Sequence, residues 1–499
     1  MPDDTTDLDL VEDKLKCGEK FSFGAGDFAA NILQSAISFY FIYFLINVSG
    51  VTPYFASVIN IVGRAWDAIA SYAMGGISDR CNHSLGKRRV FIIFGAITFG
   101  ASFILLWITP GQDKSQAVKA VYYIIMYIIY DTCWAIVYTP YNTLSANMTK
   151  NYDERTSLNG WRITMANIGI IFGAALFALL ADGTESLLYK PMKSVPKAYM
   201  VAGVLFAILS AICMLCSGLF VKERCDNTEQ TNKSIFQTVK ELVSIKEFRN
   251  CTLTYVSSMV GFDVIMMTFM FFVNDSLKFG GGIMAMVYVA IPLVCAILSA
   301  AFWVILSEKF SKAAVYSAAA VFMSVVLIFA IFIPEKTNWA IIVLTIFAGM
   351  GLSGIQILPN AALPDVVEID EYKFGTRREG AYYGLILFLY KVCSGIFMSI
   401  VSAVLGAFGY KESTNGQSVE QPKKALMAVR IVIGTVPGIF FLLGIIPAIR
   451  GRISREEFAK IKQQLAEKHA EQNPLEKIES SSSSSSDLVK LADDKEPLN

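Results

Sequence analysis

Twelve long apolar stretches, separated by short segments that hold most of the charged residues, limit the folds open to this chain. Each stretch has roughly 20 to 28 residues, and a helix of that length crosses the roughly 30 Å hydrocarbon core of a membrane. Backbone amides in lipid must bond within their own segment, so we expect helices. The predicted spans are 27–49, 53–78, 89–109, 118–146, 160–182, 198–221, 251–274, 281–307, 313–334, 338–362, 380–409 and 425–449.

Composition excludes several classes of protein. Hydrophobic residues make up 54% of the 499 residues and charged residues 17%, whereas soluble domains carry about a quarter charged residues. The net charge of +1 offers no electrostatic footprint for nucleic acid. The two histidines, His83 and His469, lie outside the predicted spans, and no nucleophile motif or metal cluster is visible. We therefore expect a membrane protein that is not an enzyme and needs no cofactor.

The arrangement of positive charge predicts the topology. An even number of spans places both termini on one side, and the segments on that side carry more Lys and Arg, for example Lys87, Arg88 and Arg89 after the second span. Because Lys and Arg accumulate in cytoplasmic loops, both termini are predicted to be cytosolic. We expect a monomeric, multi-pass protein of the plasma membrane.

The longest internal polar segment divides the chain at its middle. It covers 222–249 and has six predicted spans on either side, which suggests a duplication. We predict an all-α membrane protein with two six-helix bundles, at 1–221 and 250–450, and a substrate site between them near the membrane midplane. The tail, 451–499, reads as a charged helix followed by a disordered serine run.

Five ordered motifs resemble one transporter family. They are GAGDFAANI (24–32), GRAWDAI (63–69), SDRCNHSLGKRR (78–89), DERTSLNGWR (153–162) and LPDVVEIDEYKFGTRREGAYYG (363–384). Together they resemble the glycoside, pentoside and hexuronide:cation symporters of the major facilitator superfamily. That family includes the melibiose permeases and, among its animal relatives, the sodium-dependent lysophosphatidylcholine symporters. The resemblance implies the major facilitator fold and transport by alternating access.

One set of residues is predicted to couple transport to a cation. A charge at the bilayer centre costs at least about 2.5 to 3.5 kcal/mol, so Asp67 needs a partner or a function. Arg64 on the same helical face is a structural alternative, whereas the resemblance implies a cation site at Asp67. Ser71 stands where the family has a second aspartate, so the coupling ion could be Na⁺ or H⁺, or transport could be uncoupled. Lys391 matches a lysine that the family places beside the cation site, and we predict that it pairs with Asp67 across the two bundles.

A second set is predicted to bind the solute, with Lys391 beside it. Asp27 and Arg162 match family positions that engage the polar part of the substrate, although Arg162, near a predicted span end, could instead be a cytosolic anchor. Tyr138 replaces an acidic sugar-binding residue of melibiose permease, and Asn142 replaces an aromatic one. Both differences argue against an identical sugar specificity.

Two further groups of charged residues remain. Asp131 and Asp263 lie in the fourth and seventh spans, and they either contact substrate, as the lysolipid branch suggests, or form hydrogen bonds between helices. Charges near the span ends are predicted to form a cytosolic gate between the bundles, with a topology signal as the alternative. They are Asp79, Arg80, Arg88, Asp365, Arg377 and Arg378.

These patterns predict a symporter that moves a sugar or glycoside by alternating access, with Na⁺ or H⁺ as the coupling ion. A lysophospholipid is the rival substrate. A membrane sensor built on the same fold is a third hypothesis, and it would bind a ligand without accumulating it. The expected partners are the solute and membrane lipid.

Overall fold

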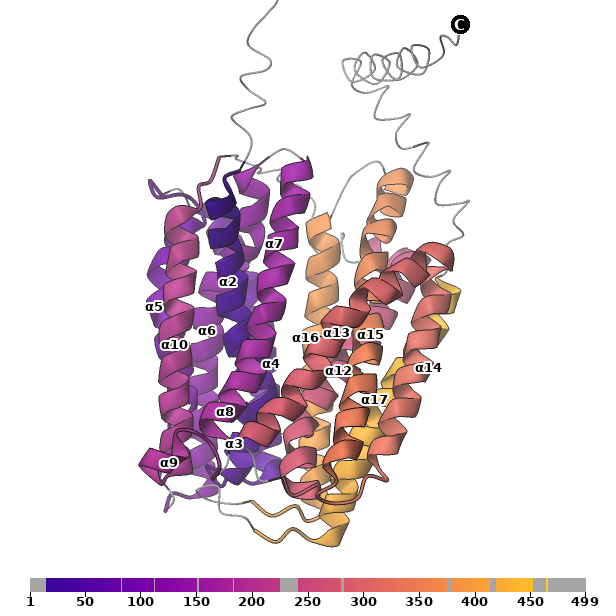
Figure 1. Cartoon of the computed structure of the whole chain (residues 1–499). Coiled ribbons are helices and arrows are strands. Elements are labelled where there is room, and N and C mark those ends of the chain that lie inside the picture. Colours follow the sequence, from indigo (N-terminus) through magenta and orange to yellow (C-terminus); the bar gives the residue numbers. More distant parts are fainter. Residues whose placement is uncertain are drawn as a thin grey trace, which may run out of the picture.

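The computed structural model of the chain describes residues 15–451 and 464, apart from 82, 112, 150–151, 183, 225–240, 280–281, 375–378 and 413–418. In this part the chain forms twelve long helical passes. The passes stand side by side in two groups (Figure 1). The groups follow the order of the sequence, six passes in each. All elements of the described part are helices, in agreement with the predicted all-α fold of two six-helix bundles.

The first bundle contains six passes, two of which are built from more than one helical segment. The first pass is α2, η1 and α3, and the fifth is α7, η2 and α8, where η1 and η2 are π-helical. The elements are α2 (Cys17–Ala36), η1 (Ile37–Phe41), α3 (Ile42–Asn47), α4 (Pro53–Arg80), α5 (Arg89–Leu106), α6 (Gln116–Met148), α7 (Tyr152–Ile171), η2 (Phe172–Leu176), α8 (Phe177–Ala181), the short α9 (Tyr189–Met192), which precedes the sixth pass, and α10 (Val195–Phe220).

The second bundle repeats this plan. Its first pass, like that of the first bundle, contains a π-helical segment, which here stands at the end of the pass. The elements are α12 (Lys246–Met270), η3 (Phe271–Ser276), α13 (Gly282–Lys309), α14 (Lys312–Ala330), α15 (Asn338–Phe374), α16 (Glu379–Ala407) and α17 (Lys423–Arg450).

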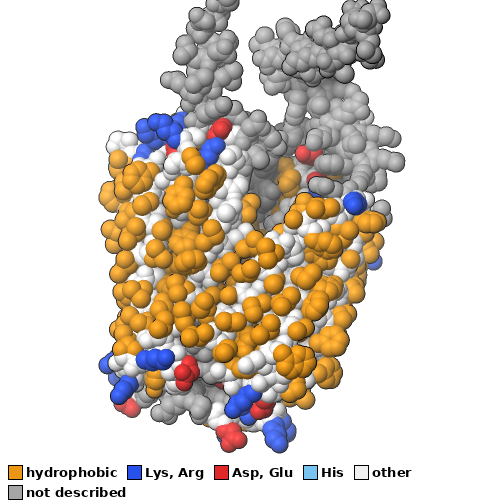
Figure 2. Space-filling model, viewed as in Figure 1, with side chains coloured by type: hydrophobic (Ala, Val, Ile, Leu, Met, Phe, Trp, Pro, Cys, Tyr) orange, Lys and Arg blue, Asp and Glu red, His pale blue; other side chains and the backbone are white. Residues whose placement is uncertain are grey.

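On the face shown in Figure 2, the surface of both bundles is apolar over most of the height of the helices, with Lys, Arg, Asp and Glu gathered at the two ends. Eleven helices of the described part are long and apolar enough to cross a membrane. The helix that does not meet this criterion is α4, which carries Arg64 and Asp67 and has them buried. A hydrocarbon-facing band with charged ends is the surface that a bilayer requires.

Several helices extend beyond the predicted spans at the end of the molecule from which α2 starts. The first pass begins at Cys17 instead of 27, the fifth at Tyr152 instead of 160, and α15 continues to Phe374 instead of 362. The seventh begins at Lys246, inside the predicted linker. Arg162 is therefore between two and three turns inside α7, although it still lies near the start of the apolar span, Gly160–Ala181. The predicted tail lies outside the described residues, except for 451 and 464.

The two bundles meet closely at the end that contains α3, α8 and η3, and the ribbons diverge toward the opposite end (Figure 1). Asn47 of α3 donates a hydrogen bond to Tyr410 at 3.0 Å, and Tyr410 donates to Asp275 of η3 at 2.6 Å. Beside them, Asn274 of η3 donates to Asp182 at 2.8 Å. This group of five residues, called here the end latch, joins the bundles through buried polar side chains.

Asp182 is the first residue after α8 and lies fully inside this contact. Burial raises the pKa of the Asp182 carboxyl to about 6, while the hydrogen bonds from Asn274 and Tyr199 act in the opposite direction. A carboxyl in such an environment is stable only while its hydrogen-bond donors stay in place. The end latch therefore depends on close contact between the bundles.

Candidate functional site

The predicted solute-binding residues come together in the first bundle. Asp27 of α2 is 2% exposed, and its two carboxylate oxygens accept hydrogen bonds from different helices. Arg162 of α7 donates to one oxygen through Nε, and Tyr138 of α6 donates to the other at 3.1 Å. Arg162 also donates through Nη2 to the Asn142 side-chain oxygen. The structure thus joins all four residues in one group, called here the Asp27 cluster.

Aromatic rings of α6 form one wall of the Asp27 cluster. The ring centroids of Trp134 and Tyr138 are 4.5 Å apart, and those of Tyr138 and Tyr141 are 5.8 Å apart. The guanidinium of Arg162 lies 5.6 Å from the centroid of Tyr141. Sequence reasoning missed Trp134 and Tyr141. Their spacing of three and four residues from Tyr138, which puts them on one helical face, was the signal that could have found them.

The predicted pair between Asp67 and Lys391 is confirmed. Lys391 Nζ of α16 lies 2.8 Å from Asp67 Oδ2 of α4, so the ion pair crosses from one bundle to the other. Ser71 Oγ donates to Asp67 Oδ1 at 3.1 Å, and Lys391 Nζ donates to Ser71 Oγ at 3.4 Å. The alternative partner, Arg64, directs its Nη2 toward the sulfur of Met398 at 3.9 Å.

The remaining buried acids have different surroundings. Asp263 of α12 accepts hydrogen bonds from Tyr390, at 2.8 Å, and from Ser394, both in α16. These are hydrogen bonds between helices, which was one of the two predicted roles of this residue. Asp131 of α6 is 6% exposed, and in the described part of the chain its Oδ2 has no hydrogen-bond partner. The two acids therefore differ, because Asp263 is held by donors and Asp131 has an oxygen left over.

The contacts that the structure gives for Asp365 and Arg88, two of the predicted gate residues, are made within one bundle. Asp365 of α15 pairs with Lys312 of α14 at 2.6 Å. The backbone amide of Arg88 donates to Glu223 at 2.9 Å, and its guanidinium donates to the carbonyl oxygen of Thr143. Arg377 and Arg378, and the side chains of Asp79 and Arg80, lie outside the described residues. A charged gate between the bundles stays a prediction.

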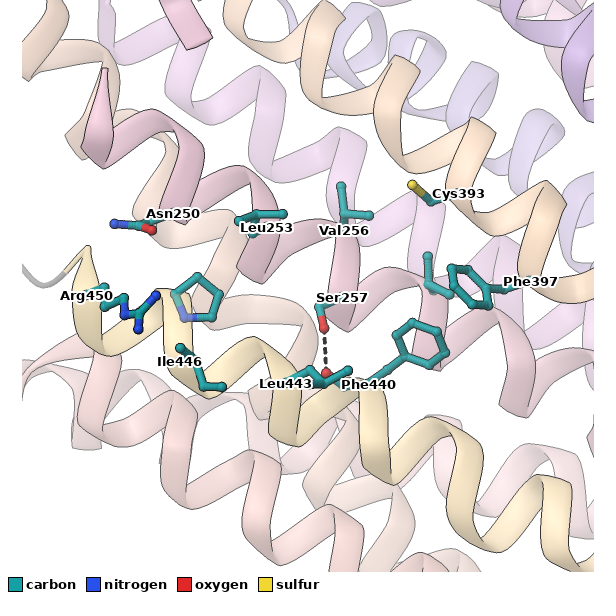
Figure 3. Close-up of a pocket in the computed structure, with 12 residues that line it drawn as sticks. Asn250, Leu253, Val256, Ser257, Cys393, Phe397, Phe440, Leu443, Ile446 and Arg450 are labelled. Carbon is teal, nitrogen blue, oxygen red and sulfur yellow. Dashed lines mark hydrogen bonds between the residues drawn. The ribbon is translucent and has the colours of Figure 1, made fainter. Parts of the chain in front are cut away.

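A pocket of about 340 Å³ lies apart from these clusters, between α12, α16 and α17 (Figure 3). Its lining is largely apolar, with Asn250 and Arg450 at one end and Phe397 and Phe440 at the other (Figure 3). Leu443, which also lines it, is 52% exposed, so the pocket reaches the apolar outer surface. It contains none of the predicted site residues.

Comparisons with known proteins agree with this architecture. Residues 22–455 match a family model described as MFS/sugar transport protein. An uncharacterized symporter of Synechocystis sp. is 26% identical, over 91% of this chain and 98% of its own length. The sodium-dependent lysophosphatidylcholine symporter 1 of Xenopus tropicalis is 24% identical over 89% of each chain. In fold, the chain is similar to a bacterial homologue of the human lysosomal transporter Spinster, with a TM-score of 0.62, 12% identity and coverage of 88% and 100%.

Proposed function

We propose that the solute of this chain, which belongs to the MFS/sugar transport protein family, is a sugar or glycoside. The chain is a multi-pass membrane symporter, not an enzyme. The observation that carries this proposal is the Asp27 cluster, because it gathers one acceptor and several donors beside aromatic rings. The coupling ion, Na⁺ or H⁺, is proposed to act at Asp67.

A polyhydroxylated solute fits the chemistry of the Asp27 cluster. The carboxylate of Asp27 can accept two hydroxyl bonds, and the guanidinium of Arg162 donates a planar fork. Tyr138 and Asn142 supply further polar atoms at the same place. Pockets for small ligands combine a few placed polar groups with aromatic walls, and here Trp134 and Tyr141 are the wall. Asp27 and Arg162 are bonded to each other, so a solute that binds here exchanges its own hydrogen bonds for theirs.

The Asp67 to Lys391 pair supports coupling because it joins the two bundles. A cation that binds Asp67 competes with the Lys391 ammonium for the same carboxylate, so ion binding weakens a contact between the bundles. A ligand shifts a conformational equilibrium by the difference in its affinity for the two states. Ion and solute together are therefore proposed to favour the change from one open side to the other.

The charge distribution supports an orientation with both termini in the cytosol, and the membrane is proposed to be the plasma membrane. In that orientation the end latch lies on the outer side, and the bundles diverge toward the cytosol (Figure 1). The conformation described here is then proposed to be the inward-facing one. This proposal agrees with the pairing of Asp365 to Lys312 inside one bundle, because a closed cytosolic gate needs partners from both bundles.

A lysophospholipid is the second candidate solute. The 24% identical lysophosphatidylcholine symporter favours it, and so does an apolar pocket with Arg450 at one end, where an acyl chain and a phosphate could lie. The pocket and the Asp27 cluster share no residue, however, so one lysolipid would leave the buried Asp27 cluster without a role. We therefore place the sugar first.

Transport by purified protein in liposomes tests the two solutes. A panel of labelled glucosides, galactosides and pentosides and labelled lysophosphatidylcholine would be offered to the same proteoliposomes. We expect accumulation of a member of the sugar panel, and we expect Asp27→Asn to raise its half-saturating concentration roughly 10- to 100-fold, because the buried donors lose a charged acceptor. Asp113→Asn, which changes an exposed carboxylate in a loop, is the matched control.

Three outcomes would contradict the proposal. Accumulation of lysophosphatidylcholine with no sugar transport would make the second candidate the function. Normal sugar transport by Asp27→Asn would remove the Asp27 cluster from the binding site. Sugar binding by the detergent-solubilised protein without accumulation in liposomes would favour a sensor over a transporter.

A further inference from the structure

We infer that Asp131 of α6 is a ligand of the coupling cation, together with Asp67 and Ser71 of α4, and that the ion is Na⁺. The inference rests on the proposed coupling at Asp67. It identifies the ion, and it assigns to Asp131 the role of the second carboxylate, which is missing at the position of Ser71. Three observations carry it: the register of two helices, an unpartnered buried oxygen and the balance of charge around it.

The register between α4 and α6 places Asp131 opposite Asp67. The two helices pack against each other and run in the same direction, since one intervening pass, α5, separates them. A β-carbon on Gly63 would lie 2.4 Å from the Tyr127 ring, and one on Gly75 would lie 3.9 Å from Thr139. Both helices advance by the same twelve positions between these contacts, from 63 to 75 and from 127 to 139.

Asp67 and Asp131 lie one turn beyond Gly63 and Tyr127 on their respective helices, because each is four residues further along. A hydrogen bond at the same level supports the register, since Trp66 Nε1 donates to Thr132 Oγ1 at 2.8 Å. Asp131 also interacts electrostatically with Asp67, Arg64 and Lys391. The two carboxylates are therefore neighbours, with the Ser71 hydroxyl bonded to the first.

Asp131 carries the observation that points to a ligand. Its side chain is 6% exposed, and Oδ2 is buried with no hydrogen-bond partner among the described residues. A buried carboxylate oxygen that lacks both donor and solvent is costly. Asp263, the other acid near Arg64, has Tyr390 and Ser394 as donors. The oxygen of Asp131 is thus the one in this region that is suited to an incoming cation.

The charge balance indicates a small monovalent ion. Two cations, Lys391 and Arg64, interact with three buried acids, Asp67, Asp131 and Asp263, so one negative charge is left uncompensated. Hard cations bind oxygen, and Asp131, Asp67 and Ser71 offer two carboxylates and a hydroxyl. No group of three or more His, Cys, Asp or Glu suited to a metal occurs in the part of the chain that the structure describes. The single uncompensated negative charge matches the charge of Na⁺, whereas a divalent ion would leave the site with an excess positive charge.

Na⁺ binding by the purified full chain, measured without sugar, tests this inference. The readout is the thermal stability of the detergent-solubilised protein against NaCl concentration, with choline chloride keeping the ionic strength constant. We expect Na⁺ to stabilise the native chain, because an ion that binds only the folded state does so. Asp131→Asn should raise the half-saturating Na⁺ concentration at least about tenfold.

Two further variants keep the test decisive. Thr132→Val removes a hydrogen bond between the same helices but no carboxylate, and its Na⁺ response should equal that of the native chain. Ser71→Asp combined with Asp131→Asn returns a carboxylate from α4, and it should bring the half-saturating Na⁺ concentration back toward the native value. If Asp131→Asn alone fails to fold, this double variant and Asp131→Glu, which keeps the charge, decide the question.

A native-like Na⁺ response in Asp131→Asn overturns the inference, and so does a double variant whose half-saturating Na⁺ concentration does not return toward the native value. It is also overturned if Na⁺ does not stabilise the native chain while a proton gradient drives uptake. Failure of the proposed solute is separate. If Na⁺ binding depends on Asp131 but no sugar accumulates, the ion site stands and the solute is wrong. If sugar accumulates and Na⁺ has no effect, the solute stands and the ion site is wrong.

Discussion

Two ion pairs dominate the polar interior at the scale of single residues, and they have different structural roles. Asp27 and Arg162 lie in the same bundle, so a solute that replaces their mutual bonds can do so without moving the bundles. Asp67 and Lys391 lie in different bundles, so a change in their bond changes how the bundles are held together. This difference is the basis for assigning binding to the first pair and coupling to the second.

Replacing Asp67 by asparagine should separate these two roles. We expect Asp67→Asn to lose stimulation of sugar uptake by an imposed Na⁺ or proton gradient, with a fall of at least about tenfold in gradient-driven uptake, because an amide does not compensate the charge of an ion or of Lys391. Exchange of labelled for unlabelled sugar, which needs no ion gradient, should persist. The measurement is counterflow and gradient-driven uptake in the same proteoliposomes.

Ser399→Ala is the control for this test, because Ser399 accepts a hydrogen bond from Asn60 at 3.2 Å across the same interface without any charge. Gradient-driven uptake by Ser399→Ala should stay close to native. Unchanged gradient-driven uptake by Asp67→Asn would refute the assignment of this carboxylate to coupling.

How much of the site the sequence predicts depends on the residue. The pairing of Asp67 with Lys391 was predicted from the cost of a charge in lipid, because each buried ion needs a partner, together with the family resemblance, which implies a lysine beside the cation site. The roles of Asp27 and Arg162 came from family resemblance. The leftover oxygen of Asp131 could not be predicted, because it depends on which donors the folded helices bring near. A span pattern contains no information about side-chain partners in other helices.

At the scale of helices, the sequence predicts the number and order of the passes but not their ends. Hydropathy falls where the first charged residues appear, while the helices at Cys17, Tyr152 and Phe374 continue past the apolar part. The three π-helical segments were also missed. A π-segment shifts the backbone hydrogen bonds by one residue, and such shifts have no clear composition signal, although they are frequent at functional sites.

The close packing of α2 against the fifth pass should be sensitive to one added methyl group. A β-carbon on Gly173 of η2 would lie 1.9 Å from Ser35 Oγ and 2.3 Å from the carbonyl oxygen of Ile32, and a carbonyl in a helix cannot move freely. We expect Gly173→Ala to destabilise the protein by about 1 to 3 kcal/mol through overpacking. It should also weaken sugar binding, since α2 carries Asp27 and the fifth pass carries Arg162.

Thermal unfolding and sugar-binding affinity measure this effect. Gly76→Ala is the matched control, because nothing lies within 4 Å of a β-carbon at that position of α4. That variant should unfold within a degree or so of the native protein. Equal unfolding temperatures for Gly173→Ala and Gly76→Ala would show that the contact between α2 and η2 is looser than described.

At the scale of the whole molecule, the bundles are joined unequally at their two ends. The end latch consists of buried hydrogen bonds from Asn47, Tyr410 and Asn274 to partners across the interface or beside it. The described ion pairs at the opposite end, such as Lys312 with Asp365 and Lys20 with Glu154, lie within a bundle. This asymmetry is what a transporter open to one side requires.

Removing the hydroxyl of Tyr410 should loosen the end latch. Tyr410→Phe takes a donor from Asp275 and a partner from Asn47, so the closed end loses about 1 to 3 kcal/mol. The ratio of closed to open molecules should then fall by roughly 5- to 150-fold. Spin labels at Lys190 and Lys336, exposed residues of the two bundles at that end, would report a second and longer distance.

Tyr288→Phe is the control for the end latch, because Tyr288 bonds to Asn338 at 3.1 Å within the second bundle. Its distance distribution should match that of the native chain. A single, native-like distance in Tyr410→Phe would mean that apolar contacts alone keep this end closed.

The acidic and basic side chains around Asp67 have an electrical consequence. Lys391 and Arg64 carry two positive charges and Asp67, Asp131 and Asp263 carry three negative ones, so the site has one excess negative charge when empty and none with bound Na⁺ and an uncharged sugar. Membrane voltage therefore acts on the return of the empty carrier and not on the loaded one. For one charge, 100 mV corresponds to about 2.3 kcal/mol, enough for a roughly fifty-fold accumulation of solute toward the negative side.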